Sequence, residues 1–247
     1  MATMLENKSA VVNRLKQDIL RLQGFAPSEN PTGKIGLGPI ESVFPNGVFP
    51  AWGIHEFIST SPEQEAAASG FIGGILARLM EGGKVCLWIS NSKVLFPPAI
   101  RAFGVEPDRI VFVDMARQRD VLWAMEEGLK CPGLAAVVAE VRELEFVQSR
   151  RLQLAVEKSR IMGFVLRSNP RKIGATASVA RWQIRHLASA LEEGLPGVGF
   201  PRWEVELMKV RNGHPGYWKI EWSSGNFIPV DLPMQPGVLS LYDRKSG

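Results

Sequence analysis

The chain has 247 residues, of which 45% are hydrophobic and 22% are charged. This length allows a single domain with a sizeable core, and the composition is that of an ordinary soluble globular protein. We find neither an apolar run of membrane-spanning length nor the apolar core of a signal peptide. These features exclude an integral membrane protein, and we expect a cytoplasmic location with no membrane partner.

Charge is unevenly distributed along the chain. Residues 1–141 contain 13 Lys/Arg and 15 Asp/Glu, a net charge of −2, whereas residues 142–247 contain 16 and 10, a net charge of +6. A basic C-terminal part indicates an anionic partner, of which nucleic acid is the commonest. Solvated faces of an ordinary domain would give the same balance, so charge alone leaves both interpretations open.

Residues 6–23 are predicted to form an amphipathic helix. Its apolar side chains, Val12, Leu15, Ile19 and Leu22, follow a 3-4-3 spacing. Gly24 ends the helix, and residues 25–46 read as a linker rich in Pro, Gly and Ser. A helix set apart in this way packs on a partner, on a second copy of the chain or back on its own core. We take these four residues as candidates for partner binding or self-association.

Residues 49–81 predict a strand, a polar turn and a helix that begins near Gln64. This is the arrangement in which P-loop proteins hold nucleotide phosphates, using glycines, a lysine and a Ser/Thr. The matching positions here hold Ser59, Gln64, Glu65 and Ala66, and Glu65 would repel phosphates. We therefore expect a structural corner with no nucleotide cofactor and no catalytic residues.

The rest of the chain alternates between strand and helix patterns, which predicts a parallel sheet with helices on both faces. The predicted strands are 84–90, 109–114, 134–140 and 163–167, and the predicted helices are 99–104, 118–129 and 146–159. Three later segments, 181–185, 203–210 and 217–222, alternate polar and apolar residues. The turn at 212–216 joins the last two as a hairpin, so we predict an antiparallel extension at one edge.

The C-terminal strands interleave aromatic and basic residues, which suggests a platform for stacking bases. Trp218 and Trp222 would share one face at strand spacing, and such a stripe more often packs on a core. The histidines, His55, His186 and His214, are scattered without ligand spacing, so we expect no metal site.

Several segments resemble the ImuA family, RecA-related accessory proteins of SOS mutagenesis. They are FPNGVFPAWGIHEF, AFGVEPDRIVFV, DVLWAMEEGLKCPGLAAVVAEV, SRRLQLAVEKS, ARWQI and PRWEVELMKVRNGHPGYWKIEW. The resemblance covers about residues 47–222 and implies an α/β, RecA-like core, with a mainly parallel sheet flanked by helices. We divide the chain into an N-terminal helix (1–24), a linker (25–46), the core (47–228) and a C-terminal tail (229–247).

The resemblance also implies a function in the DNA damage response. It implies a non-catalytic accessory protein for mutagenic translesion synthesis, with an ImuB-like protein and an error-prone DNA polymerase as partners. RecA and single-stranded DNA are further partners that it suggests. The acidic position of the Walker-B strand corresponds to Glu140, for which we expect a hydrogen-bonding role at a strand end.

RecA-like proteins hold DNA in two loops, and the second corresponds to residues 168–176. It keeps Arg171 and Lys172, with Arg167 just before it. These three residues predict weak, non-specific phosphate contacts, or else exposed loop charges without a partner. Two other functions stay open: an ATP-dependent RecA-like DNA-binding ATPase with an atypical nucleotide site, and a cell-division inhibitor.

Overall fold

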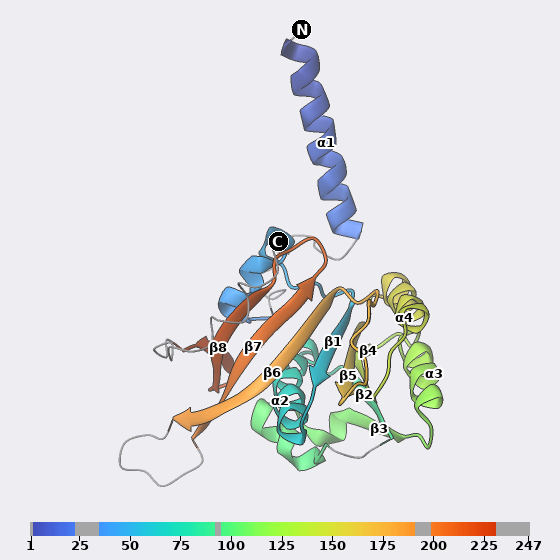
Figure 1. Cartoon of the computed structure of the whole chain (residues 1–247), viewed down its shortest axis with the longest axis vertical. Coiled ribbons are helices and arrows are strands. Elements are labelled where there is room, and N and C mark those ends of the chain that lie inside the picture. The colour runs from blue at the N-terminus through green and yellow to red at the C-terminus, as the bar shows by residue number, and fades with distance from the viewer. Residues whose placement is uncertain (1, 23–34, 92–94, 191–198, 231–247) are drawn as a thin grey trace.

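The computed structural model describes residues 2–22, 35–91, 95–190 and 199–230, and every structural statement below concerns these residues. Their strands form one sheet in the order β3-β2-β4-β5-β1-β6-β7-β8-β9 (Figure 1). The strands are β1 (Ile54–Ser59), β2 (Val85–Ser90), β3 (Ile110–Asp114), β4 (Leu134–Val141), β5 (Met162–Ser168), β6 (Ala180–Ala190), β7 (Phe200–Val210), β8 (Gly216–Ser223) and β9 (Asn226–Pro229).

Helices cover both faces of the parallel half of this sheet. They are α2 (Pro62–Leu79), α3 (Gln118–Gly128) and α4 (Phe146–Ser159), while a further helix, α1 (Ala2–Leu22), lies apart from these faces (Figure 1). Apolar residues of α2 join one core cluster, while those of α3 and α4 join a second cluster on the opposite face (Figure 1). The predicted α/β architecture is confirmed.

The antiparallel half begins at β6, which pairs in parallel with β1 and antiparallel with β7. Its inner face is aromatic: Trp182, Trp203 and Trp222 are buried and pack around Phe71 and Phe227. These tryptophans therefore belong to the core and present no platform for bases, as the strand spacing favoured.

Three parts of the fold differ from the prediction. The short helix predicted at residues 99–104 is a 3-10 helix, η4, which begins earlier (Pro97–Phe103) and which Gly104 ends with a φ of 83°. The second half of the predicted linker contributes buried side chains to the core, among them Leu37 and Ile40, from η2 (Gly38–Val43) and the segment before it. Strand β9 had no counterpart in the prediction. Neither had two short 3-10 helices, η3 (Pro45–Gly47) and η5 (Pro107–Arg109).

Helix α1 extends away from the sheet in Figure 1. Val12, Leu15 and Ile19 are exposed on it, while Leu20 is half-buried and packs against the first core cluster. The side chain of Leu22, the fourth predicted association residue, lies outside the described residues. Among the helices that the structure describes, none is both long and apolar enough to cross a membrane.

Candidate functional site

The corner between β1 and α2, where a P-loop would hold phosphates, is occupied by hydrogen bonds between its own residues. The Gln64 side-chain oxygen accepts from Thr60 N at 3.0 Å and from Thr60 Oγ1 at 3.2 Å. Ser61 caps α2 by accepting from Gln64 N at 3.4 Å. Glu63 and Glu65 lie in the first turn, so the positive end of the helix dipole already faces carboxylates. The corner therefore offers no cation to a phosphate and repels it electrostatically.

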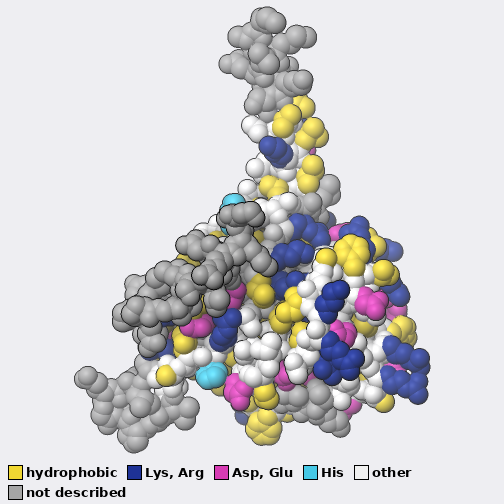
Figure 2. All heavy atoms as spheres, in the orientation of Figure 1, with side chains coloured by type: hydrophobic (Ala, Val, Ile, Leu, Met, Phe, Trp, Pro, Cys, Tyr) yellow, Lys and Arg dark blue, Asp and Glu magenta, His cyan; other side chains and the backbone are white. Residues whose placement is uncertain are grey.

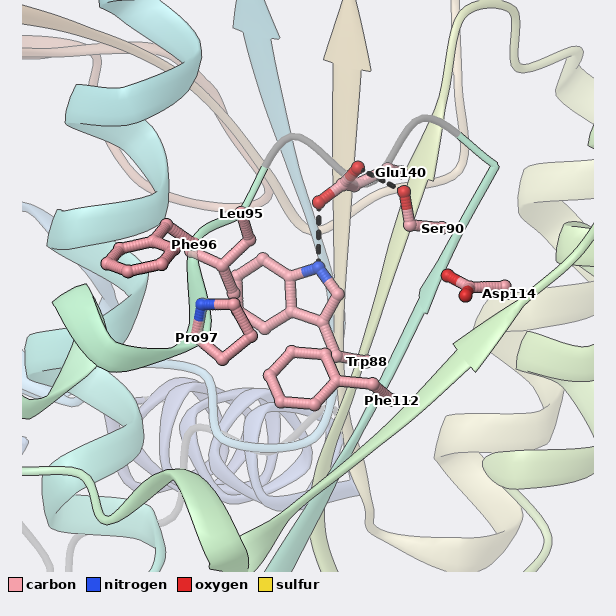
Figure 3. Close-up of a pocket in the computed structure, with 8 residues that line it drawn as sticks. All are labelled: Trp88, Ser90, Leu95, Phe96, Pro97, Phe112, Asp114 and Glu140. Carbon is pink, nitrogen blue, oxygen red and sulfur yellow. Dashed lines mark hydrogen bonds between the residues drawn. The ribbon is translucent and has the colours of Figure 1, made fainter.

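A pocket of about 430 Å³ lies near the carboxyl ends of β2, β3 and β4 (Figure 3). Glu140 borders it and accepts hydrogen bonds from Trp88 Nε1 at 2.7 Å and from Ser90 Oγ at 2.5 Å. Both carboxylate oxygens therefore accept hydrogen bonds, and Glu140 is buried. This geometry agrees with the expected role of Glu140 as a hydrogen-bonding acid at a strand end.

The connection from β5 to β6, residues 169–179, is an extended segment that we call the strap. Ser168 lies beside Ser59 at the carboxyl end of β1, whereas Ala180 lies beside His55 near the start of β1. The strap therefore runs back along the sheet without a helix, although parallel strands are usually joined through one. An extended segment cannot satisfy its own backbone groups, so these need partners elsewhere.

Cationic side chains from neighbouring elements supply those partners. The donors and the strap carbonyl oxygens are Arg142 Nε to Asn169 (3.1 Å), Arg167 Nη2 to Lys172 (2.9 Å), Arg181 Nη2 to Gly174 (2.6 Å), Lys209 Nζ to Thr176 (2.8 Å) and Arg211 Nη2 to Ala177 (2.6 Å). Charged donors make stronger hydrogen bonds than neutral ones, so the strap is held along most of its length.

Glu56 of β1 balances part of this positive charge beneath the strap. One carboxylate oxygen accepts from Arg167 Nη1 at 2.7 Å; the other accepts from Arg181 Nε at 3.0 Å and from Thr176 Oγ1 at 2.7 Å. Glu56 is completely buried. Burial, together with the nearby Arg181, lowers the pKa of Lys209, the other cation beneath this part of the strap.

The structure separates the three residues predicted to contact DNA. Arg171 and Lys172 are exposed on the strap. Arg167 is only 1% exposed, and its guanidinium donates to Glu56, Glu143 and the strap backbone. A DNA contact by Arg167 does not fit this geometry, because a phosphate cannot reach a buried and fully engaged guanidinium. Its position holds the strap from beneath.

Comparison with known proteins identifies the family of this chain. No protein-family model matches the chain. Protein ImuA of Caulobacter vibrioides, from strains NA1000 / CB15N and ATCC 19089 / CIP 103742 / CB 15, is 33% identical over 211 residues, which cover 79% of this chain and 86% of the relative. The chain belongs to the ImuA family.

The fold of this ImuA-family chain also resembles a solved recombinase. The crystal structure of the RadB recombinase superposes with a TM-score of 0.54 at 12% identity, covering 81% of this chain and 100% of RadB. At that identity the likeness establishes the RecA-like fold alone. It agrees with the RecA-like core expected from the sequence.

The residues that hold the strap were not identified from the sequence as a functional group. Glu56 lies in the apolar strand IHEFIS, where an acidic residue is a signal of a buried ion pair. Arg167 and Arg181, its partners, lie 111 and 125 residues further along the chain. Local sequence patterns contain no information on such pairings, so Arg181, Lys209 and Arg211 could be found only from the structure.

Proposed function

We propose that this ImuA-family chain is a non-catalytic RecA-like accessory protein in mutagenic translesion synthesis. Family membership and the RecA-like fold support a DNA-damage accessory role in general. The observation that carries the non-catalytic part is the β1–α2 corner, where Gln64 and Ser61 satisfy the backbone and Glu63 and Glu65 occupy the first helical turn. An ATP cycle needs positive charge at this position.

Thermal unfolding with and without Mg-ATP tests the non-catalytic role. A ligand that binds only the folded state raises the melting temperature by mass action. We expect no rise in the wild-type chain, and none in the Glu65→Lys variant, because a single lysine does not create the glycine-rich loop. A concentration-dependent rise in the wild-type chain would instead favour the ATPase alternative.

The proposed mechanism is recruitment of an ImuB-like protein and an error-prone polymerase. α1 supports it, because Val12, Leu15 and Ile19 leave an apolar stripe exposed on a helix that extends from the core. Co-purification with the ImuB-like protein, repeated after deletion of residues 6–23, tests this role. We expect a complex indifferent to Mg-ATP and weakened by the deletion; unchanged binding and unchanged mass would remove α1 from the mechanism.

The strap supports weak, non-specific binding of single-stranded DNA. RecA, the other suggested partner, would bind the same DNA beside this chain or in competition with it. Arg171 and Lys172 are exposed on a segment whose backbone is fixed from beneath. Each phosphate contact on a single strand contributes about 0.7 to the slope of log affinity against log salt. We expect the double variant Arg171→Ala/Lys172→Ala to reduce that slope by about 1.4; Arg101→Ala, an exposed arginine on η4, is the matched control.

A further inference from the structure

Large apolar side chains are exposed where α4 lies beside the strap. Phe146 and Val147 in the first turn of α4 are 55% and 67% exposed, and Ile173 on the strap is 44% exposed. In Figure 2, apolar and basic side chains lie close together around α4, on the right of the view. Single exposed apolar residues are ordinary, so the neighbours of each side chain decide whether it has a role.

Two hydrogen bonds fix the position of Phe146 beside the strap. Glu143 Oε1, just before α4, accepts from Arg171 N at 2.8 Å. Ser149 Oγ, within α4, accepts from Ala177 N at 2.9 Å. Ser149 follows Phe146 by three residues and therefore lies on the same side of the helix. The exposed ring of Phe146 thus lies between the two contacts, next to the part of the strap that runs from Arg171 to Ala177.

Cationic side chains lie at both ends of this part of the strap. Arg171 and Lys172 are exposed at its start, and neither has an ion-pair partner among the residues that the structure describes. Arg211 lies at its end, and Arg150 lies on α4 one helical turn beyond the phenyl ring. Glu157 Oε1 is 3.8 Å from Arg150 Nη1 and 3.9 Å from Arg211 Nη1, so one carboxylate faces two guanidiniums.

The carboxylates nearest to the ring do not cancel this positive charge. Glu143 Oε2 pairs with Nη2 of the buried Arg167 at 3.3 Å. Glu145 closes the capping box of α4, where the positive end of the helix dipole faces it. The charges of Arg171 and Lys172, and the second guanidinium beside the single carboxylate at the other end, therefore remain to attract an anion.

We propose that Phe146 stacks on an unpaired base of single-stranded DNA, while the phosphates on either side of that base contact the cations at the two ends. This inference rests on the DNA binding proposed above and adds to it a preference for unpaired over paired bases. A positively charged groove with an aromatic ring suits single strands of any sequence, because every base has a π-face. The bases of a duplex are stacked on one another and leave no face for the ring. An acidic protein segment would satisfy the cations but would offer the ring no planar partner.

Fluorescence anisotropy with two labelled oligonucleotides of equal length tests the proposal on the full chain. One is an oligothymidylate; the other has a stable abasic analogue at every position, so both present the same phosphates but only the first presents bases. We expect the wild-type chain to bind the oligothymidylate more tightly than the abasic strand. Phe146→Ala should weaken binding of the oligothymidylate about fivefold or more. Binding of the abasic strand and the slope of log affinity against log salt should not change, because the phosphate contacts remain.

Three further variants separate stacking from other effects. Phe146→Leu keeps an apolar side chain of similar size without a π-face and should show the same loss as Phe146→Ala, which guards against a folding defect. Phe146→Trp should retain the wild-type affinity. Val147→Ala removes a similarly exposed apolar side chain from the next position of α4, and Phe96→Ala removes an exposed ring outside α4 and the strap; neither should alter binding.

The outcomes distinguish failure of stacking from failure of DNA binding. Unchanged affinity of Phe146→Leu for the oligothymidylate, or an equal loss for both oligonucleotides, would overturn the stacking role and leave phosphate binding by the strap in place. Displacement of the oligothymidylate by polyglutamate as readily as by the unlabelled oligonucleotide would show a site for any polyanion and would also overturn it. If the wild-type chain bound neither oligonucleotide, both this inference and the DNA binding proposed above would be wrong.

Discussion

The two faces of strand β1 bury polar side chains in opposite ways. His55 lies on the face of α2, among aromatic rings, with Phe49 stacked at a centroid distance of 4.5 Å. Trp182 Nε1 donates to His55 Nδ1 at 3.2 Å, so His55 Nε2 carries the proton that reaches Pro50 O at 2.9 Å. Glu56, the next residue, lies under the strap and forms ion pairs with two arginines. On one face burial disfavours the charged form of His55, while on the other Glu56 is paired with arginines.

This difference concerns where the cationic side chains lie: beneath the strap and not at the β1–α2 corner. A nucleotide-binding RecA-like core needs cations at the β1–α2 corner; here the corner contains uncharged and acidic side chains. The cations instead converge on Glu56 and on the carbonyl oxygens of the strap. These cations donate hydrogen bonds to the protein's own backbone, and they hold the extended strap in place.

Replacing Glu56 by glutamine should break the charged face most severely. Two buried guanidiniums would lose their counter-charge, and removal of one partner of a buried pair costs about 3 to 5 kcal/mol. Urea unfolding measures the effect. Glu106→Gln, which removes the partner of the exposed Arg101, is the control and should cost about 1 kcal/mol or less. A loss for Glu56→Gln as small as that of the control would show that the buried pairs are not needed for stability.

Acidification should break the neutral face. Burial, the largest cause, lowers the pKa of His55 from 6.5 to about 4. The folded state thus binds fewer protons than the unfolded state between these values, so this contribution is complete above pH 6.5 and is lost as pH falls toward 4. The loss should reach about 3 kcal/mol. Unfolding free energy measured across that range should fall accordingly, and a flat profile would contradict this account.

Replacing Trp182 by phenylalanine should sharpen the comparison by freeing His55 Nδ1. We expect a loss of about 2 kcal/mol at neutral pH from the lost hydrogen bond and the smaller ring. The pKa of His55 should rise, because a proton could then enter at Nδ1 without meeting an indole N–H. The loss of stability between pH 6.5 and 4 would become smaller than in the wild-type chain. NMR titration of the His55 ring protons measures the pKa, and an unchanged value would contradict this account.

The smallest effect should come from the exposed cations of the strap. Arg171→Ala/Lys172→Ala should change the unfolding free energy by no more than about 0.5 kcal/mol, because neither side chain is buried. A loss comparable to that of Glu56→Gln would mean that the exposed and buried cations act as one structural unit. The same variant then serves the DNA-binding test with an intact fold.

Much of the fold was predictable, because its elements follow local patterns. Helix α4 begins and ends where the periodicity places it, and the parallel strands lie within a few residues of their apolar runs. The short helix predicted at residues 99–104 is the 3-10 helix η4, because two prolines at its start and Gly104 after it leave too few residues for regular α-helical bonding.

The site was predictable only where it depends on residue type. The sequence itself shows that no P-loop lysine stands near Gln64. Arg171 and Lys172 are exposed on the strap, as is usual for charged residues in a loop. The burial of Arg167 was not predictable, because it depends on Glu56 and on a connection that replaces a helix with extended backbone.

The position of β1 in the sheet determines when its strand pairs can form during synthesis. Among the strands that the structure describes, β1 leaves the ribosome first, yet its neighbours in the sheet are β5 and β6. Until residues 162–168 of β5 have emerged, β1 has neither of its neighbouring strands to pair with, and Glu56 has neither of its arginine partners until residue 167 arrives. The nascent chain must therefore keep its central strand without its neighbouring strands until β5 has been made, and completion of the sheet depends on long-range pairing.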